Sequence, residues 1–144
     1  MRILYTAAAT SIGGRKGHGA TADGKLKTDF SVPKEMGGDN GKGVNPEQLF
    51  SLGYSSCFGS AIQHVAGIRK RKIEEIAVTA HTSIGRKEGP GGLALEVTLD
   101  IRLPDLPQAE AEEIVAEADR VCPYSNAIRG NVTVHLRVAG HKGT

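Results

Sequence analysis

The stretch from Asn45 to about Ala66 or Gly67 restricts the fold more than any other part of the chain. Asn45 is a good N-cap, Pro46 suits the first helical position, and Gln48 completes a capping box, so the sequence predicts a helix start here. Large apolar side chains then face nearly all directions, mixed with small ones such as Gly53 and Cys57. Such a helix is buried, and its small side chains let other elements approach closely.

Extended segments surround this helix in the sequence. Asp23-Gly24 predicts a hairpin turn, and the residues at 93–103 alternate cleanly between apolar and polar, as in a half-buried strand. Before the first helix we expect a strand at 3–12, a hairpin at 21–32 and a loop at 34–43. After it we expect strands at 74–84 and 93–103 around a turn at 89–92, a second helix at 104–122, a turn at 125–130 and a strand at 131–138. The second helix carries an apolar stripe made of Ala111, Ile114, Val115, Ala118, Val121 and Cys122. This order favours one α+β domain over residues 1–144, with helices packed on an antiparallel sheet.

Composition and charge exclude several classes of function. The formal net charge is only +2 and aromatic residues are 4%, which argues against a nucleic-acid partner. No apolar run is long enough to span a membrane and the N-terminus does not resemble a signal peptide, so we expect a cytoplasmic protein with no membrane partner. The basic run RKRK at 69–72 could bind anions or nucleic acid, but the low net charge favours a solvated helix end.

The chain has two cysteines, Cys57 within the first helix and Cys122 at the end of the second, directly before Pro123. Each could be an inert core residue, since free cysteine is often buried as a small hydrophobe. In a cytoplasmic protein the alternative is a redox-active pair rather than a lasting structural disulfide. A metal site is not supported, because the cysteines and the five histidines lack the spacing of zinc ligands.

Two charged residues add to the cysteines. Glu47 lies in the first turn of the helix that carries Cys57, and Arg15 lies in a glycine-flanked bend. A buried carboxylate needs a partner, and the planar fork of arginine is the favoured one. The simpler interpretation is that Glu47 complements the helix N-terminus while Arg15 is solvated.

Four segments together resemble the organic hydroperoxide resistance (Ohr) branch of the Ohr/OsmC family. They are LYTAAATSIGGRKG, NPEQLFSLGYSSCF, GPGGLALEV and VCPYSNAIRGN, and they occur in the expected order over nearly the whole chain. The resemblance implies a thiol-dependent peroxidase that reduces organic hydroperoxides to alcohols. It assigns Cys57 as the peroxidatic cysteine and Cys122 as the resolving cysteine, with Arg15 and Glu47 as assisting residues.

The resemblance also implies an OsmC-like fold in which antiparallel sheets wrap central helices in an intertwined homodimer, with fatty-acid and other apolar hydroperoxides as substrates. The implied electron donor is an external dithiol of the lipoyl type, dihydrolipoamide or a lipoylated protein, with no bound cofactor and no metal. Candidate contacts for the apolar tail of the substrate are Phe30, Met36, Leu49, Phe50, Phe58 and Ile128; ordinary core or dimer packing is the alternative for each.

The implied chemistry sets an electrostatic requirement. A thiol with a pKa near about 8.5 is only a few per cent ionised at neutral pH. Lowering that pKa to about 6 corresponds to about 3.4 kcal/mol of preferential stabilisation of the anion. Burial acts in the opposite direction, so a nearby guanidinium is expected to supply the stabilisation, with Glu47 orienting Arg15 through a bidentate pair.

Three other functions remain open from the sequence. One is an enzyme of the OsmC branch with broader use of peroxides. Another is a redox sensor or carrier of apolar ligands that uses the same disulfide as a switch. The last is a structural domain with two inert cysteines. Turnover with a dithiol, and its dependence on Cys57, separates these functions.

Overall fold

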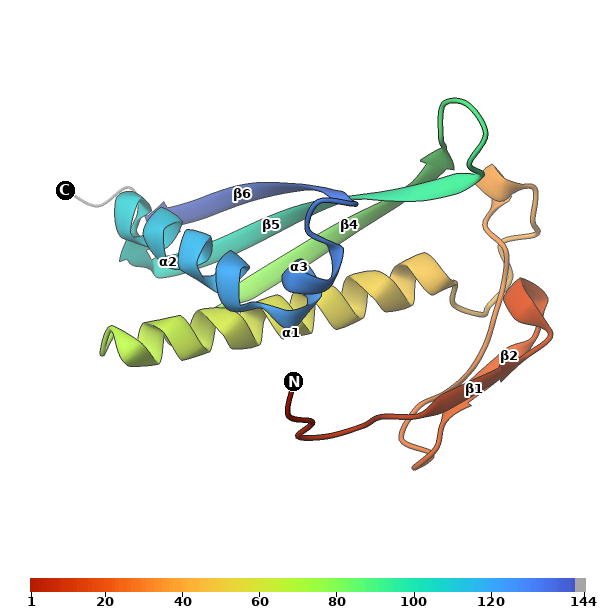
Figure 1. The fold of residues 1–144 in the computed structure, drawn as a ribbon, viewed down its shortest axis with the longest axis horizontal. Helices are drawn as coiled ribbons and strands as arrows, with labels where there is room; N and C mark the ends of the chain where they lie inside the picture. The colour runs from red at the N-terminus through yellow and green to blue at the C-terminus, as the bar shows by residue number, and fades with distance from the viewer. Residues whose placement is uncertain (142–144) are drawn as a thin grey trace. The chain divides into compact units, whose positions relative to one another are not determined.

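A computed structural model describes residues 1–141 of the chain (Figure 1). The chain forms two compact units, Met1–Leu49 and Phe50–Thr144, and each is described by itself. The prediction of one domain over residues 1–144 stays a prediction. Among the described residues, no helix combines the length and the apolar character needed to cross a membrane.

The first unit contains a small antiparallel sheet in the order β1-β2-β3, made of Ala9–Ile12, His18–Thr21 and Lys27–Asp29. The predicted hairpin is confirmed: β2 and β3 pair antiparallel, and Gly24 in the turn has a φ of 76°. The strand predicted at 3–12 is too long, because β2 offers β1 only four residues for pairing before that turn begins. The predicted loop at 34–43 contains one 3-10 turn, Lys34–Met36.

Helix α1 spans Pro46–Ile68, close to its predicted bounds. The capping box is formed as predicted: the Gln48 N–H donates to Asn45 Oδ1 at 2.8 Å, and the Asn45 N–H donates to Gln48 Oε1 at 3.0 Å. Six residues of the helix are buried, but Leu52 and the last residue, Ile68, are 66% and 69% exposed. The burial predicted for all sides is therefore not reached within one chain.

The second unit contains the sheet β4-β5-β6, made of Ala77–Arg86, Leu93–Pro107 and Thr133–His141. Strands β4 and β5 pair antiparallel as predicted, whereas β6 runs parallel to β5. The purely antiparallel sheet is thus corrected at β6, because helices α2 (Gln108–Val121) and α3 (Pro123–Ile128) carry the chain back across the sheet between β5 and β6. Helices α1 and α2 lie on the same face of this sheet (Figure 1).

The start of α2 differs from the prediction. The helix spans Gln108–Val121, and the segment 104–107, predicted to be helical, extends β5 instead. Pro104 and Pro107 explain the difference, because a proline disfavours helical geometry in the residue before it and breaks a helix interior.

The end of α2 also departs from the prediction. Val121, placed on the apolar stripe by its spacing, is 47% exposed, while Cys122 has no exposed surface. The segment 125–130 is not a simple turn, because a short helix α3, Pro123–Ile128, begins at Pro123, a residue well suited to the first helical position.

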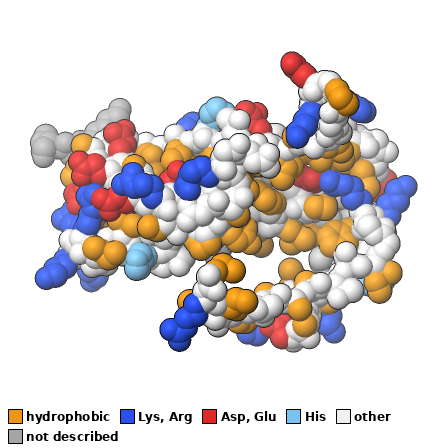
Figure 2. Space-filling model, viewed as in Figure 1, with side chains coloured by type: hydrophobic (Ala, Val, Ile, Leu, Met, Phe, Trp, Pro, Cys, Tyr) orange, Lys and Arg blue, Asp and Glu red, His pale blue; other side chains and the backbone are white. Residues whose placement is uncertain are grey.

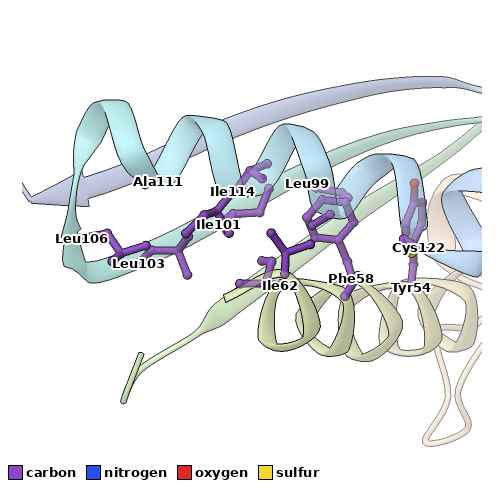
Figure 3. Close-up of a cluster of buried hydrophobic side chains, with 14 of the residues drawn as sticks. Tyr54, Phe58, Ile62, Leu99, Ile101, Leu103, Leu106, Ala111, Ile114 and Cys122 are labelled. Carbon is purple, nitrogen blue, oxygen red and sulfur yellow. The ribbon is translucent and has the colours of Figure 1, made fainter. Parts of the chain in front are cut away.

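The core of the second unit lies between α1, β5 and α2 (Figure 3). Phe58 and Ile62 of α1 point toward the alternating side chains of β5, which are buried from Val97 to Leu103, whereas Leu93 at the start of the predicted alternation is 54% exposed. Cys122 belongs to the same cluster, next to the end that holds Tyr54.

The basic run 69–72 is not simply solvated. Arg69 pairs with Glu113 and Glu117 of α2, and Arg71 pairs with Glu110 at 2.7 Å. Figure 2 shows acidic and basic side chains intermixed over α2 and the end of α1. These pairs tie the end of α1 to α2 and engage both arginines of the run, which argues further against an anion-binding role.

Candidate active site

The two thiols of the chain meet. Cys122 donates its S–H to Cys57 Sγ across 3.8 Å, and both cysteines are free. Cys57 is half-buried in the middle of α1, whereas Cys122 is completely buried. An S–S bond is about 2.05 Å long, so the sulfurs need to approach by less than two ångströms to form one. The proximity expected of a redox-active pair is therefore confirmed.

Pro123 accounts for the position of Cys122. The backbone of Cys122 is extended, with φ −65° and ψ 121°, while its N–H still donates to Ala118 O at 2.8 Å. Cys122 thus ends α2 and directly precedes α3. The chain changes direction at this residue, and its side chain turns into the core toward α1.

The surroundings of Cys57 in the second unit disfavour its anion. Burial raises the pKa of the Cys57 thiol, and the neighbouring Cys122 raises it further, while a hydrogen bond from the Tyr124 backbone N–H lowers it. Burial acts in the direction predicted from the sequence, and the predicted opposing effect comes from Arg15. That effect of Arg15 on the thiol stays a prediction.

One buried hydrogen bond next to the cysteines was not predicted from the sequence. Tyr54 Oη and Ser125 Oγ are 2.7 Å apart, and Tyr54 has no exposed surface. The sequence feature that could have indicated this contact is the spacing, since Tyr54 precedes Cys57 by three residues and Ser125 follows Cys122 by three.

In the first unit, Arg15 and Glu47 form the predicted bidentate pair. Arg15 Nη1 and Nη2 donate to the two carboxylate oxygens of Glu47 at 2.9 and 2.6 Å. Only 13% of the Glu47 side chain and 32% of the Arg15 side chain are exposed. The hydrogen bonds from Arg15 hold the pKa of the Glu47 carboxyl below its ordinary value. The alternative in which Arg15 is simply solvated is therefore excluded.

The glycines around Arg15 permit this pair. Gly13 has a φ of 85°, and the chain then makes a 3-10 turn at Gly14–Lys16 between β1 and β2. A Cβ on Gly17 would lie 1.6 Å from the carbonyl oxygen of Ile12, so no other residue fits this bend. The turn projects the Arg15 fork toward the first turn of α1, where Glu47 lies.

The six residues predicted to contact substrate are found in different settings. Phe30 and Leu49 line one apolar pocket of the first unit, and Met36 is half-buried at the end of the 3-10 turn outside that pocket. Phe50 and Ile128 pack at the edge of the second unit's core. Phe58 has no exposed surface, so it supports the fold from the core instead of lining an open pocket.

Within residues 1–141, no group of three or more His, Cys, Asp or Glu side chains is arranged to hold a metal ion.

Known proteins resemble the chain over nearly its whole length. A family model described as OsmC-like protein matches residues 38–137. The organic hydroperoxide resistance protein of Xanthomonas axonopodis pv. citri is 44% identical over 138 residues, 96% of each chain. OhrB of Bacillus subtilis is 41% identical over 94% of this chain and 98% of its own.

Solved structures agree. An organic hydroperoxide resistance protein from Elizabethkingia anophelis, with thiocyanate bound, has a TM-score of 0.92 and 45% identity and covers 98% of this chain and 100% of its own. A putative organic hydroperoxide resistance protein from Vibrio cholerae, with captopril bound in one of its active sites, has a TM-score of 0.90 and 44% identity, with 100% and 96% covered. The resemblance noted in the sequence is confirmed: this chain belongs to the Ohr/OsmC family.

Proposed function

We propose that this chain is a thiol peroxidase that reduces organic hydroperoxides to alcohols and so contributes to organic hydroperoxide resistance. The observation that carries the proposal is the 3.8 Å contact between a half-buried Cys57 and a fully buried Cys122. Cys57 is the less buried of the two residues, so it is the proposed point of attack for a peroxide, and the sulfur of Cys122 is in reach for the next step. The names of the relatives support the same substrate class.

In the first step the Cys57 thiolate attacks the distal oxygen of the hydroperoxide. The O–O bond breaks, the alkoxide takes up a proton and leaves as the alcohol, and Cys57 becomes a sulfenic acid. Cys122 then attacks the sulfenic sulfur, which releases water and leaves an intramolecular disulfide. An external dithiol reopens this disulfide by thiol–disulfide exchange, which restores both thiols.

Arg15 is the proposed source of the missing electrostatic stabilisation. Burial raises the pKa of Cys57, so a reactive thiolate at neutral pH requires a cation close to the sulfur. The bidentate contact with Glu47 fixes the guanidinium in one orientation, and Glu47 belongs to the helix that carries Cys57. A fixed guanidinium stabilises both the thiolate and the departing alkoxide.

The substrate, the donor and the assembly complete the proposal. Phe30 and Leu49, which share an apolar pocket, are the first candidates for contact with an apolar tail. The proposed donor is dihydrolipoamide or a lipoylated protein. We further propose a homodimer, because large apolar side chains such as Leu4 and Leu52 are 90% and 66% exposed in a single chain.

Steady-state reduction of cumene hydroperoxide and hydrogen peroxide, with dihydrolipoamide as donor, tests the proposal. We expect turnover that favours the organic peroxide and is abolished in Cys57→Ser. Cys122→Ser should consume about one equivalent of peroxide and then stop cycling with the dithiol. Equal use of both peroxides would favour an enzyme with broader peroxide use.

A single oxidation without dithiol-driven turnover would favour a redox sensor. Wild-type activity equal to that of Cys57→Ser would leave a structural domain with inert thiols. In the same preparation, light scattering coupled to gel filtration measures the molar mass and tests the dimer.

A further inference from the structure

The core next to the cysteine pair contains an unusual polar contact. Apart from the hydroxyl of Tyr54, the buried core of the described residues is apolar except at Ser125, which is 3% exposed. The Ser125 hydroxyl forms a hydrogen bond with Tyr54 Oη at 2.7 Å. Both residues are buried, and burial raises the pKa of the Tyr54 phenol. Two buried hydroxyl groups cost free energy unless they satisfy each other, so this contact depends on its geometry.

Each of the two residues in this contact lies three positions from a cysteine. Tyr54 lies three residues before Cys57, which places both on the same face of α1, about one turn apart. Ser125 lies three residues after Cys122, in the short helix α3. The hydrogen bond therefore joins α1 to the segment 122–125 one helical turn away from the sulfur–sulfur contact.

Packing alone would not require these hydroxyl groups. Tyr54 already packs through its ring, with centroids 6.0 Å from Phe50 and 6.4 Å from Phe58, as phenylalanine could. A hydroxyl pair adds direction, because a hydrogen bond weakens steeply when its angle or length changes. What it adds here is a fixed distance between α1 and the residues that follow Cys122.

We propose that Tyr54 and Ser125 are positioning residues for the resolving step, holding Cys122 against α1 so that its sulfur reaches Cys57. This inference rests on the proposed function. In that step the Cys122 sulfur bonds to the sulfenic sulfur of Cys57, the S–O bond breaks, and the hydroxide leaves as water with the proton of the Cys122 thiol. The attack of Cys57 on peroxide does not involve Cys122, so it does not depend on this contact.

Tyr54→Phe and Ser125→Ala test the proposal, with Ser51→Ala as the matched control. Ser51 Oγ forms a hydroxyl–hydroxyl bond of the same length, 2.7 Å, from the same helix to Thr82 of β4, away from the cysteines. Reduced protein is mixed rapidly with one equivalent of cumene hydroperoxide. Peroxide loss reports the first step, and acid-quenched thiol counts with dimedone capture report the lifetime of the sulfenic acid.

We expect unchanged peroxide consumption in all variants. Disulfide formation should slow by about fivefold in Tyr54→Phe and in Ser125→Ala, the factor that corresponds to a typical hydrogen bond. Dimedone capture should rise in both variants, and Ser51→Ala should behave as wild type. Because the two hydroxyl groups act together, the double variant should be no slower than either single one.

A second measurement does not need peroxide. Equilibration of each protein against reduced and oxidised dithiothreitol gives the stability of the Cys57–Cys122 disulfide directly, and we expect a shift of about fivefold toward the dithiol in the two variants. If wild type consumes no peroxide, the proposed function fails, and this equilibrium still decides the positioning role. Wild-type values for Tyr54→Phe and Ser125→Ala in both experiments would overturn the inference.

Discussion

Gly53 of α1 lies against the ring of Tyr124, two residues after Cys122. A Cβ at this position would lie 2.8 Å from Tyr124 Oη, 3.1 Å from Cε2 and 3.3 Å from Cζ, and the first of these distances is shorter than any ordinary contact. The same ring packs against Phe50 and Tyr54, with centroids 6.4 and 5.9 Å apart. Gly53→Ala therefore forces the Tyr124 ring away from the helix and out of both aromatic contacts.

Two effects of opposite sign decide the stability of Gly53→Ala. Replacing a glycine inside a helix by alanine stabilises the helix by about 1 kcal/mol. Losing two aromatic pairs costs about 0.5–1.5 kcal/mol each. Since Tyr124 is 41% exposed, its ring can rotate toward solvent without moving the backbone of α1. We expect a net loss of about 1 kcal/mol in the free energy of unfolding.

Urea unfolding at one fixed protein concentration measures this change, with Gly67→Ala as the control. Gly67 lies in the last turns of the same helix, and a Cβ there meets no atom within 4 Å. The control should be stabilised by up to about 1 kcal/mol. If Gly53→Ala gains as much stability as Gly67→Ala, the Tyr124 ring does not lie against α1 and the reasoning is wrong.

Three further variants test other parts of the structure. Asn45→Ala removes one side of the capping box and should cost about 1 kcal/mol in urea unfolding, with little change when Gln48 is then also replaced. Glu47→Gln should be less stable by about 1 kcal/mol at neutral pH. Because Arg15 lowers the Glu47 pKa from its ordinary 4.5, that difference is present above about pH 4.5 and should vanish as the pH falls through the folded pKa, in unfolding curves recorded from neutral to acidic pH. Phe58→Ala removes a fully buried ring and should cost about 3–5 kcal/mol; a loss under about 1 kcal/mol would contradict its place in the core.

The parts of the fold that were predicted correctly are those fixed by neighbouring residues. The start of α1 depends on Asn45, Pro46 and Gln48, and each acts within one turn of the helix. The alternation along β5 needs only a two-residue period, and the Asp23-Gly24 turn needs only a residue that accepts a positive φ. In each case the physical cause lies within a few residues of its effect.

The predictions were wrong where contacts between segments distant in the sequence determine the structure. The spacing along α2 assigned Val121 to the core, but the change of direction at Cys122 moves Val121 outward and Cys122 inward. The parallel pairing of β6 with β5 depends on where α2 and α3 cross the sheet, which no local pattern records. The charges of 69–72 appeared solvated because Glu110, Glu113 and Glu117 come about forty residues later in the sequence.

The same distinction applies to the site. The residues alone left two interpretations of Arg15 and Glu47 open, a bidentate pair and a solvated arginine, and the resemblance favoured the pair. A buried carboxylate requires such a partner, but no local pattern shows that Glu47 is shielded. The contact of Tyr54 with Ser125 could not be predicted, because an aromatic residue among apolar ones in a helix indicates core packing and its hydroxyl leaves no periodic signal. The meeting of Cys57 and Cys122 was implied by the resemblance alone, since spacing along two separate helices does not give a distance between them.

The unequal burial of the two sulfurs predicts which of them external reagents reach. Cys57 retains exposed surface, whereas Cys122 has none, so a reagent in solution can attack Cys57 while Cys122 stays protected by the core. Thiol–disulfide exchange depends on access to the attacked sulfur, so a dithiol donor should bond to Cys57 and release Cys122 as the leaving thiol.

Alkylation of the reduced protein with iodoacetamide, followed by peptide mass spectrometry, measures the access of a reagent to each cysteine. Cys57 should be modified first, even though burial raises its pKa, and Cys57→Ser should be modified slowly at Cys122. Faster modification of Cys122 would mean that the segment 122–125 opens in solution, and the donor would then attack the other sulfur.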